Sequence, residues 1–112
     1  MKADSGLAWE VLRGKEEGDR PAGRDRVEVR YTGWLPDGRI FDSSHARGDT
    51  ATFPLDRVIT GWTEGLQKMR VGEMYLFHIP AKLAYGSRPP PGSIIPRDSD
   101  LLFLVELVRI VK

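Results

Sequence analysis

The side chains with catalytic potential in this chain gather in one short stretch, Asp42-Ser43-Ser44-His45. These are the residue types of a serine hydrolase, but they are consecutive, and neighbouring side chains on an extended chain point to opposite sides. Hydrolase triads are assembled from distant segments instead. The second histidine, His78, stands alone, and no group of histidines and acidic residues has metal-ligand spacing. The sequence therefore favours neither covalent hydrolysis nor a metal site.

Three further kinds of chemistry find no support in the sequence. Cysteine is absent, which excludes disulfides, thiol nucleophiles and cysteine-ligated metals. Gly14, Gly18 and Gly23 have neither the P-loop Lys-Ser/Thr nor the dinucleotide-binding spacing. Arg47-Gly48-Asp49 matches an integrin-binding tripeptide, which we interpret as a solvated loop because three such residues occur readily by chance. We therefore predict no cofactor and no metal.

A large aromatic residue at the start of a helix is the strongest remaining signal. Trp62 comes shortly after two β-branched residues, Val58 and Ile59. Trp62, Leu66 and Met69 have the i, i+4, i+7 spacing of one apolar helix face. A tryptophan on such a face is more often part of the core, and the alternative is the floor of an apolar pocket.

The bounds of this helix follow from its flanking residues. Thr60 is the predicted N-terminal cap, and Val71-Gly72 ends the apolar pattern. Gly65 weakens the interior by about 1 kcal/mol relative to alanine. The helix should therefore be short and depend on packing against the rest of the fold.

Alternating or continuous apolar residues predict strands in the rest of the chain. The predicted strands are Leu7–Arg13, Val27–Thr32, Ile40–Asp42, Thr52–Leu55, Glu73–Ile79 and Leu101–Val111. Alternation places Leu7, Trp9 and Val11 on one side of the first strand, and Val27, Val29 and Tyr31 are predicted to face inward from the second. Pro36-Asp37-Gly38 predicts a turn, and the proline-rich stretch Ala84–Ser99 suits neither a helix nor a central strand. Several antiparallel strands and one helix predict the α+β class.

Size and charge set the remaining limits. The 112 residues predict a single domain, 1–112, with residues 1–5 loosely ordered. Seventeen basic and sixteen acidic side chains leave a net charge of +1, which argues against nucleic-acid and membrane partners. No apolar run has the length of a signal peptide or a membrane span. We expect a cytoplasmic protein by default, and a periplasmic one if the chain is a mature fragment.

The last two predicted strands carry apolar side chains on both faces. If the strands are neighbours, Met74 and Leu76 would lie beside Leu102 and Leu104 on the outer face of the sheet. Such side chains are often scattered surface residues covered by a loop or a terminus. The alternative is a patch for self-association or a partner. We expect a monomer, with weak self-association through this patch as the alternative.

Several motifs follow one another in a fixed order over nearly the whole chain, from Leu7 to Ile110. They are Tyr31-Thr32-Gly33-Trp34, Asp37-Gly38, Phe41-Asp42-Ser43-Ser44, Val58 to Leu66, Ala84-Tyr85-Gly86, Ile94-Ile95-Pro96 and Leu101 to Leu107. In this order and spacing they resemble the FKBP-type peptidyl-prolyl isomerases. The short segment Ala51–Arg57 looks most like the bacterial macrophage-infectivity-potentiator branch. That branch often carries an N-terminal helical dimerisation region, which these 112 residues lack.

The resemblance implies a bent antiparallel sheet of five to six strands, a half-barrel wrapped around the short helix, with the substrate proline between them. Trp62 would be the floor under the proline ring. The implied walls and rim are Tyr31, Phe41, Phe53, Phe103, Val58 and Ile59, with Ile95 at the mouth. The Ile59 N–H and the Tyr85 hydroxyl would bind substrate carbonyls. The implied catalytic residues are Asp42, Tyr85, Ile59, Trp62 and Phe41.

The implied activity is rotation about X–Pro bonds without a covalent intermediate, in the service of protein folding. Asp42 would face the twisting amide, although a carboxylate in this position could also anchor a turn or pair with Arg47. The expected partners are proline-containing polypeptides and macrolides of the rapamycin or tacrolimus type, with Ala51 opening one wall. Two alternatives remain: a non-catalytic binding or chaperone module that docks proline-containing segments, and a small nucleic-acid-binding barrel, which the +1 charge opposes.

Overall fold

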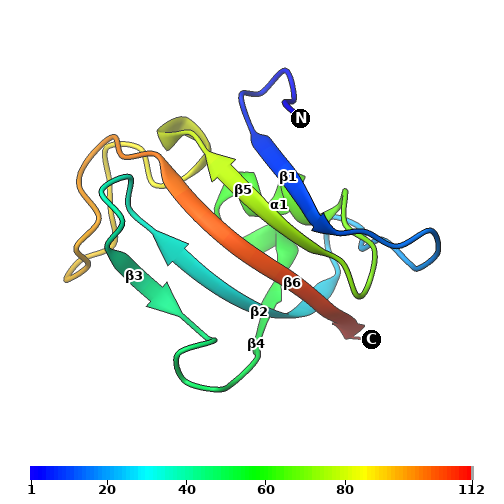
Figure 1. Cartoon of the computed structure of the whole chain (residues 1–112). Coiled ribbons are helices and arrows are strands. Elements are labelled where there is room, and N and C mark those ends of the chain that lie inside the picture. Colours follow the sequence, from blue (N-terminus) through cyan, green and yellow to red (C-terminus); the bar gives the residue numbers. More distant parts are fainter. Residues whose placement is uncertain (112) are drawn as a thin grey trace.

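The computed structural model describes residues 1–111, which form an α+β fold of one antiparallel sheet and one short helix. The strands are β1 (Ala8–Arg13), β2 (Arg26–Trp34), β3 (Ile40–Ser43), β4 (Ala51–Pro54), β5 (Met74–Ile79) and β6 (Leu101–Val111). The helix is α1 (Thr60–Leu66), and two 3-10 turns span Leu55–Arg57 and Ala81–Leu83. The strand order is β1-β5-β6-β2-β3, and β4 also pairs with β2 (Figure 1). The predicted class and the six-stranded bent sheet are confirmed.

The core lies where the inner face of the sheet meets α1. Alternation places Val27, Val29 and Tyr31 of β2 on this face, all of them buried as predicted. Neighbouring strands supply Phe77 from β5 and Phe103 from β6, which are direct cross-strand partners. A sheet that is packed on one face and open on the other produces this alternation of buried and exposed residues.

Two glycines bring α1 close to the sheet. A Cβ atom at Gly61 would lie 2.6 Å from Cγ2 of Ile79, and one at Gly65 would lie 2.6 Å from Cε1 of Phe77. Larger side chains here would push the helix away, so the lower helix propensity of glycine is offset by closer packing. The same closeness brings Trp62, which is 4% exposed, against the inner face of the sheet.

The helix differs from the predicted one at both ends. Ile59, not Thr60, is the N-cap, and no side chain caps the N-terminus; Thr60 is the first helical residue. The helix ends at Leu66, and Met69 lies in the turn that follows, where it is fully buried. The apolar spacing therefore predicted the buried residues correctly. The helix itself has only about two turns, and Met69 is buried beyond its end.

The first strand, β1, lies at an edge of the sheet. Leu7, just before it, is fully buried and Trp9 is partly buried, whereas Val11 is 37% exposed. Residues 1–5 were expected to be loosely ordered. They form a turn whose backbone bonds back to the chain, through Ala3 N–H to Leu7 O and Trp9 N–H to Met1 O. Within residues 1–111 no helix is long and apolar enough to span a membrane.

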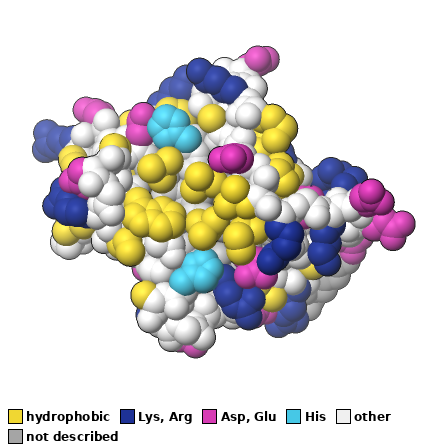
Figure 2. Space-filling model, viewed as in Figure 1, with side chains coloured by type: hydrophobic (Ala, Val, Ile, Leu, Met, Phe, Trp, Pro, Cys, Tyr) yellow, Lys and Arg dark blue, Asp and Glu magenta, His cyan; other side chains and the backbone are white. Residues whose placement is uncertain are grey.

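The outer face of the sheet carries the apolar residues expected from the sequence. β5 and β6 are neighbours, with Leu76 opposite Leu104 and His78 opposite Leu102. Trp34 of β2 is the next partner of Leu102 across the sheet. Figure 2 shows hydrophobic side chains gathered over these central strands, on the face turned away from α1. We call this set, which comprises Met74, Leu76, Leu102, Leu104 and Trp34, the outer apolar patch.

Candidate active site

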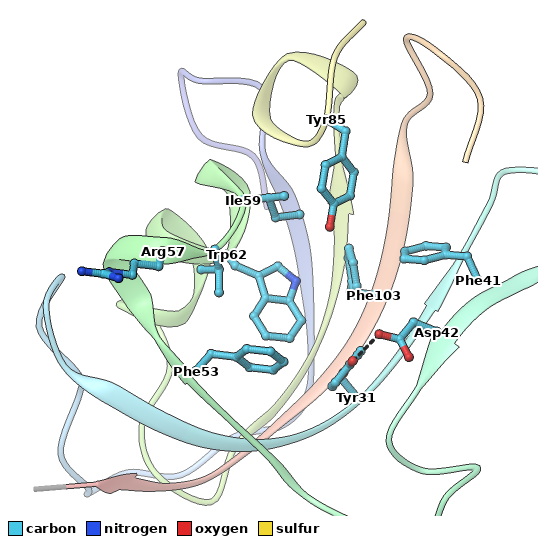
Figure 3. A pocket seen from close by; sticks show the side chains of 10 residues that line it. Tyr31, Phe41, Asp42, Phe53, Arg57, Ile59, Trp62, Tyr85 and Phe103 are labelled. Carbon is cyan, nitrogen blue, oxygen red and sulfur yellow. Dashed lines mark hydrogen bonds between the residues drawn. The ribbon is translucent and has the colours of Figure 1, made fainter. Parts of the chain in front are cut away.

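A pocket of about 450 Å³ opens between α1 and the inner face of the sheet. Strands β2, β3, β4 and β6 supply its walls, and the segment before α1 supplies its rim (Figure 3). The lining residues are Tyr31, Phe41, Asp42, Phe53, Arg57, Val58, Ile59, Trp62, Tyr85 and Phe103. The lining is therefore mostly aromatic, with few polar groups, which is typical of a small-ligand site.

Trp62 is the centre of the aromatic cluster. The centroid of its ring lies 5.3 Å from that of Tyr31, 5.4 Å from that of Phe53 and 5.3 Å from that of Phe103, and each pair of ring planes is nearly perpendicular. Edge-to-face contacts of this kind stabilise aromatic pairs by about 0.5 to 1.5 kcal/mol beyond burial. Phe41 extends the cluster through Phe103, at 5.4 Å and 89°. The walls are therefore held by one another around the indole, which forms the base of the pocket.

Gly33 of β2 makes room for two of the pocket walls. A Cβ atom there would lie 2.5 Å from Cζ of Phe41 and 2.8 Å from Cε1 of Phe103. Any side chain at this position would displace both rings. Packing against the two rings therefore requires glycine at position 33, and this requirement does not depend on backbone conformation.

The carboxylate of Asp42 is fixed from two sides. The Tyr31 hydroxyl donates a short hydrogen bond to Oδ2, and Nη1 of Arg47 lies 3.0 Å from Oδ1. The ion pair with Arg47 is one of the alternatives that the sequence left open, and Asp42 also lines the pocket. The two roles are compatible, because the pairing orients the carboxylate at the wall.

The residues after Asp42 hold β2 and β3 together and do not form a hydrolase site. The fully buried Ser44 accepts a hydrogen bond from the Tyr31 N–H at 2.8 Å and donates its own N–H to the Tyr31 carbonyl at 2.9 Å. Thr32 Oγ1 lies 2.7 Å from Ser43 Oγ and 3.0 Å from His45 Nδ1. These bonds anchor the strand segment that positions Asp42 and Tyr31.

The ionisation of the pocket residues follows from burial and pairing. Burial, followed by the hydrogen bond to Asp42, raises the pKa of Tyr31 to about 12. Burial alone would raise the pKa of Asp42, but the hydrogen bonds from Tyr31 and Arg47 outweigh it and hold that pKa below its usual value. Burial, and then the charge of Asp42, raises the pKa of Tyr85. At neutral pH the pocket therefore holds one carboxylate and two neutral phenols.

Donors without a partner face the pocket or border it. Figure 3 shows the Tyr85 hydroxyl pointing into the space above Trp62 and Phe103. The Ile59 N–H makes no hydrogen bond within residues 1–111. Among the buried side-chain polar atoms of these residues, Nε1 of Trp62 alone lacks a partner. Unpaired donors at a concave apolar surface are available to a ligand that brings its own acceptors.

The structure brings together all the predicted site residues except one. Ile95 is 6% exposed and belongs to the core, and it is not part of the pocket lining, because its loop turns it inward. Arg57 lines the pocket and was not predicted; its place directly before Val58 was the available signal. Ala51 pairs with Val29 in the sheet and does not line the pocket. No group of three potential metal ligands occurs within residues 1–111.

Comparison with known proteins agrees with this geometry. Residues 18–108 match the family model described as FKBP-type peptidyl-prolyl cis-trans isomerase, and the chain belongs to this family. It is 50% identical over 109 residues to the isomerase FkpA of Aeromonas hydrophila, covering 97% of the chain and 40% of that protein. It is 43% identical over 108 residues to the isomerase Mip of Coxiella burnetii, covering 96% of the chain and 46% of that protein.

A solved structure supports the same assignment. The crystal structure of FkpA from Escherichia coli matches 98% of the chain and 50% of that protein, with a TM-score of 0.91 and 42% identity. The chain thus spans less than half the length of the two curated relatives above.

Proposed function

We propose that this domain accelerates cis-trans isomerisation of X–Pro bonds in polypeptides, without any covalent intermediate, and thereby assists protein folding. The observation that carries the proposal is the combination of an aromatic pocket with a positioned carboxylate, Asp42, and two unpaired donors, on Tyr85 and Ile59. The pocket suits an uncharged ring, and the polar groups suit a peptide backbone.

The reaction requires loss of amide resonance and no bond cleavage. The planar amide resists rotation with a barrier of about 18 to 20 kcal/mol. A site that binds the twisted amide more tightly than the planar one lowers this barrier. About 4 kcal/mol of such differential binding accelerates the exchange roughly a thousandfold. A few hydrogen bonds and an apolar surface that excludes water from the amide are sufficient for this effect.

Each polar group of the pocket has a specific part in the proposal. Trp62 supports the proline ring while the preceding carbonyl turns. The Ile59 N–H and the Tyr85 hydroxyl hold the carbonyls that do not rotate. Asp42 faces the rotating amide, where its charge disfavours the planar resonance form with its partly negative oxygen. Tyr31 and Arg47 keep this carboxylate ionised and oriented.

Replacing Asp42 tests the catalytic role. We expect Asp42→Val to lower kcat/KM on an Ala-Leu-Pro-Phe-type peptide severalfold, measured by protease-coupled or NMR exchange, with an unchanged circular dichroism spectrum. Asp37→Val is the matched control, because Asp37 also forms an exposed ion pair with an arginine but lies outside the pocket lining. Unchanged activity in Asp42→Val would reject the role.

The alternative function is a binding or chaperone module that docks proline-containing segments without catalysis. The geometry at Asp42 favours the enzyme, because a binder of neutral proline has no need for an oriented carboxylate. Binding of proline peptides without faster exchange would establish the module instead.

Two finer features belong to the same proposal. Ligands of the rapamycin or tacrolimus type would occupy the proline pocket, and inhibition of exchange by rapamycin tests this binding. The compartment, cytoplasm or periplasm, is tested by fractionating cells that carry the complete gene.

A further inference from the structure

Arg57 is the only positively charged side chain among the residues that line the pocket. It is the last residue of the 3-10 turn Leu55–Arg57 and directly precedes the rim residues Val58 and Ile59. Its side chain is exposed, and it forms no ion pair with any residue in the range 1–111. Figure 3 shows it leaving the wall beside Trp62 and extending outward on the side opposite to Asp42.

The charges at the two ends of the pocket are therefore unequal. At one end, Asp42 is neutralised by Arg47 at 3.0 Å and bonded by Tyr31. At the other end, Arg57 has no ion-pair partner among residues 1–111. The adjacent acid, Asp56, does not line the pocket and makes no ion pair with Arg57 in the described part of the chain. The unbalanced charge at the rim is thus positive and lies at the Arg57 end.

The direction of a bound peptide follows from the position of Asp42. The bond that rotates precedes the proline, and in the proposed function this bond lies at the Asp42 wall. The chain that follows the proline must then leave at the other end, past Ile59 and Arg57. A long, flexible arginine at this point can reach a side chain of the residue after the proline without entering the pocket.

We infer that Arg57 gives the enzyme a preference for prolines that are followed by an acidic residue. The inference rests on the proposed function and adds a substrate class to it. Exposed ion pairs are weak, so the expected preference for glutamate over lysine at this position is only about threefold in kcat/KM. It should shrink toward equality as salt screens the charges.

Two pairs of peptides test this inference by NMR exchange. One pair, Ala-Leu-Pro-Glu-Ala and Ala-Leu-Pro-Lys-Ala, varies the charge after the proline. The other pair, Ala-Glu-Pro-Leu-Ala and Ala-Lys-Pro-Leu-Ala, varies the charge before it. At an ionic strength of about 0.01 M we expect the preference in the first pair only, and its loss at about 1 M.

Variants at position 57 test whether the Arg57 side chain causes the preference for an acidic residue after the proline. Arg57→Gln should bring the ratio in the first pair close to one, and Arg57→Glu should invert it. Lys15→Glu is the matched control, because it changes the net charge equally at an exposed position outside the pocket lining, and it should keep the wild-type ratio.

The outcomes separate this inference from the proposed function. Fast exchange with equal rates in the first pair, a preference found only in the second pair, or an unaltered ratio in Arg57→Gln would each overturn the inference and leave isomerase activity standing. No acceleration on any of the four peptides would instead overturn the proposed function.

Discussion

The two faces of one sheet differ in what their side chains can do. Along β6, Phe103 points to the inner face and lines the pocket, while its neighbours Leu102 and Leu104 lie in the outer apolar patch. Both faces are apolar near their centres. The inner face is covered by α1, which the close contacts at Gly61 and Gly65 bring against the sheet.

The two faces differ in whether another element covers them and in whether they hold polar groups at a concave surface. The inner face forms a concave site with a fixed carboxylate and free donors at its edge. No element within residues 1–111 covers the outer patch (Figure 2), and nearby charges pair with each other, as Glu106 does with Arg13 and Arg30. Apolar surface alone can provide adhesion, whereas a reaction needs polar groups held at a closed surface.

The largest expected effect comes from removing a tryptophan from each face. Trp62→Ala should lower the free energy of unfolding by about 3 to 5 kcal/mol, because it empties the centre of the aromatic cluster. Trp34→Ala, at a half-buried position of the outer face, should cost less, about 1 to 2 kcal/mol. Urea unfolding followed by circular dichroism measures both without relying on tryptophan fluorescence.

The same pair also distinguishes the faces by activity. Trp62→Ala should bind proline peptides more weakly, and Trp34→Ala should keep the wild-type kcat/KM. Equal losses of stability would contradict the predicted difference in packing, and a loss of activity in Trp34→Ala would show that the two faces are not independent.

A smaller effect is expected from pH. Because the pKa of Asp42 lies below its usual value and that of Tyr31 is about 12, kcat/KM should stay flat from about pH 5 to about pH 9. It should fall only as Asp42 protonates below the ordinary aspartate range. NMR exchange gives this profile, and ¹³Cζ labelling of tyrosine follows the Tyr31 phenol.

Asp42 and Tyr31 contribute to the free energy of unfolding with opposite dependences on pH. The lowered pKa of Asp42 contributes stability that is complete above its unfolded value and is lost as pH falls through the folded one. The raised pKa of Tyr31 contributes below about pH 10 and loses its effect as pH rises through about 12. A Tyr31 phenol that titrates near 10 would contradict the partly buried hydrogen bond to Asp42.

The sequence supported prediction where a pattern repeats along the chain. Period-two alternation located the strands, and it predicted the buried side of β2 at Val27, Val29 and Tyr31. Helical spacing predicted the buried face of α1. The family resemblance carried by the order of the motifs then identified most of the aromatic lining, including Trp62 on α1 and Tyr85 in a turn after β5.

Prediction from sequence failed where tertiary contacts determine which way a side chain points or where a helix begins. Val11 continues the alternation of Leu7 and Trp9 but is 37% exposed, on a strand at the edge of the sheet. Ile95 and Arg57 lie in irregular segments, where no periodicity tells which way a side chain turns. Thr60 has the chemistry of a cap, but the chain enters α1 from an extended Ile59 that takes the N-cap position without a side-chain bond.

The smallest expected effect concerns the outer apolar patch. If Leu76 and Leu104 mediate weak self-association, wild-type protein should sediment faster as its concentration rises, and Leu76→Lys and Leu104→Lys should each remove this dependence because a charge opposes apolar contact. Ile94→Lys is the control for the added charge, since Ile94 is a more exposed apolar residue outside the sheet. Isomerase activity should be unchanged in Leu76→Lys and Leu104→Lys, because the patch lies on the face opposite to the pocket. A strict monomer at every concentration, with partner binding and stability unaffected by the lysines, would reduce the patch to ordinary surface.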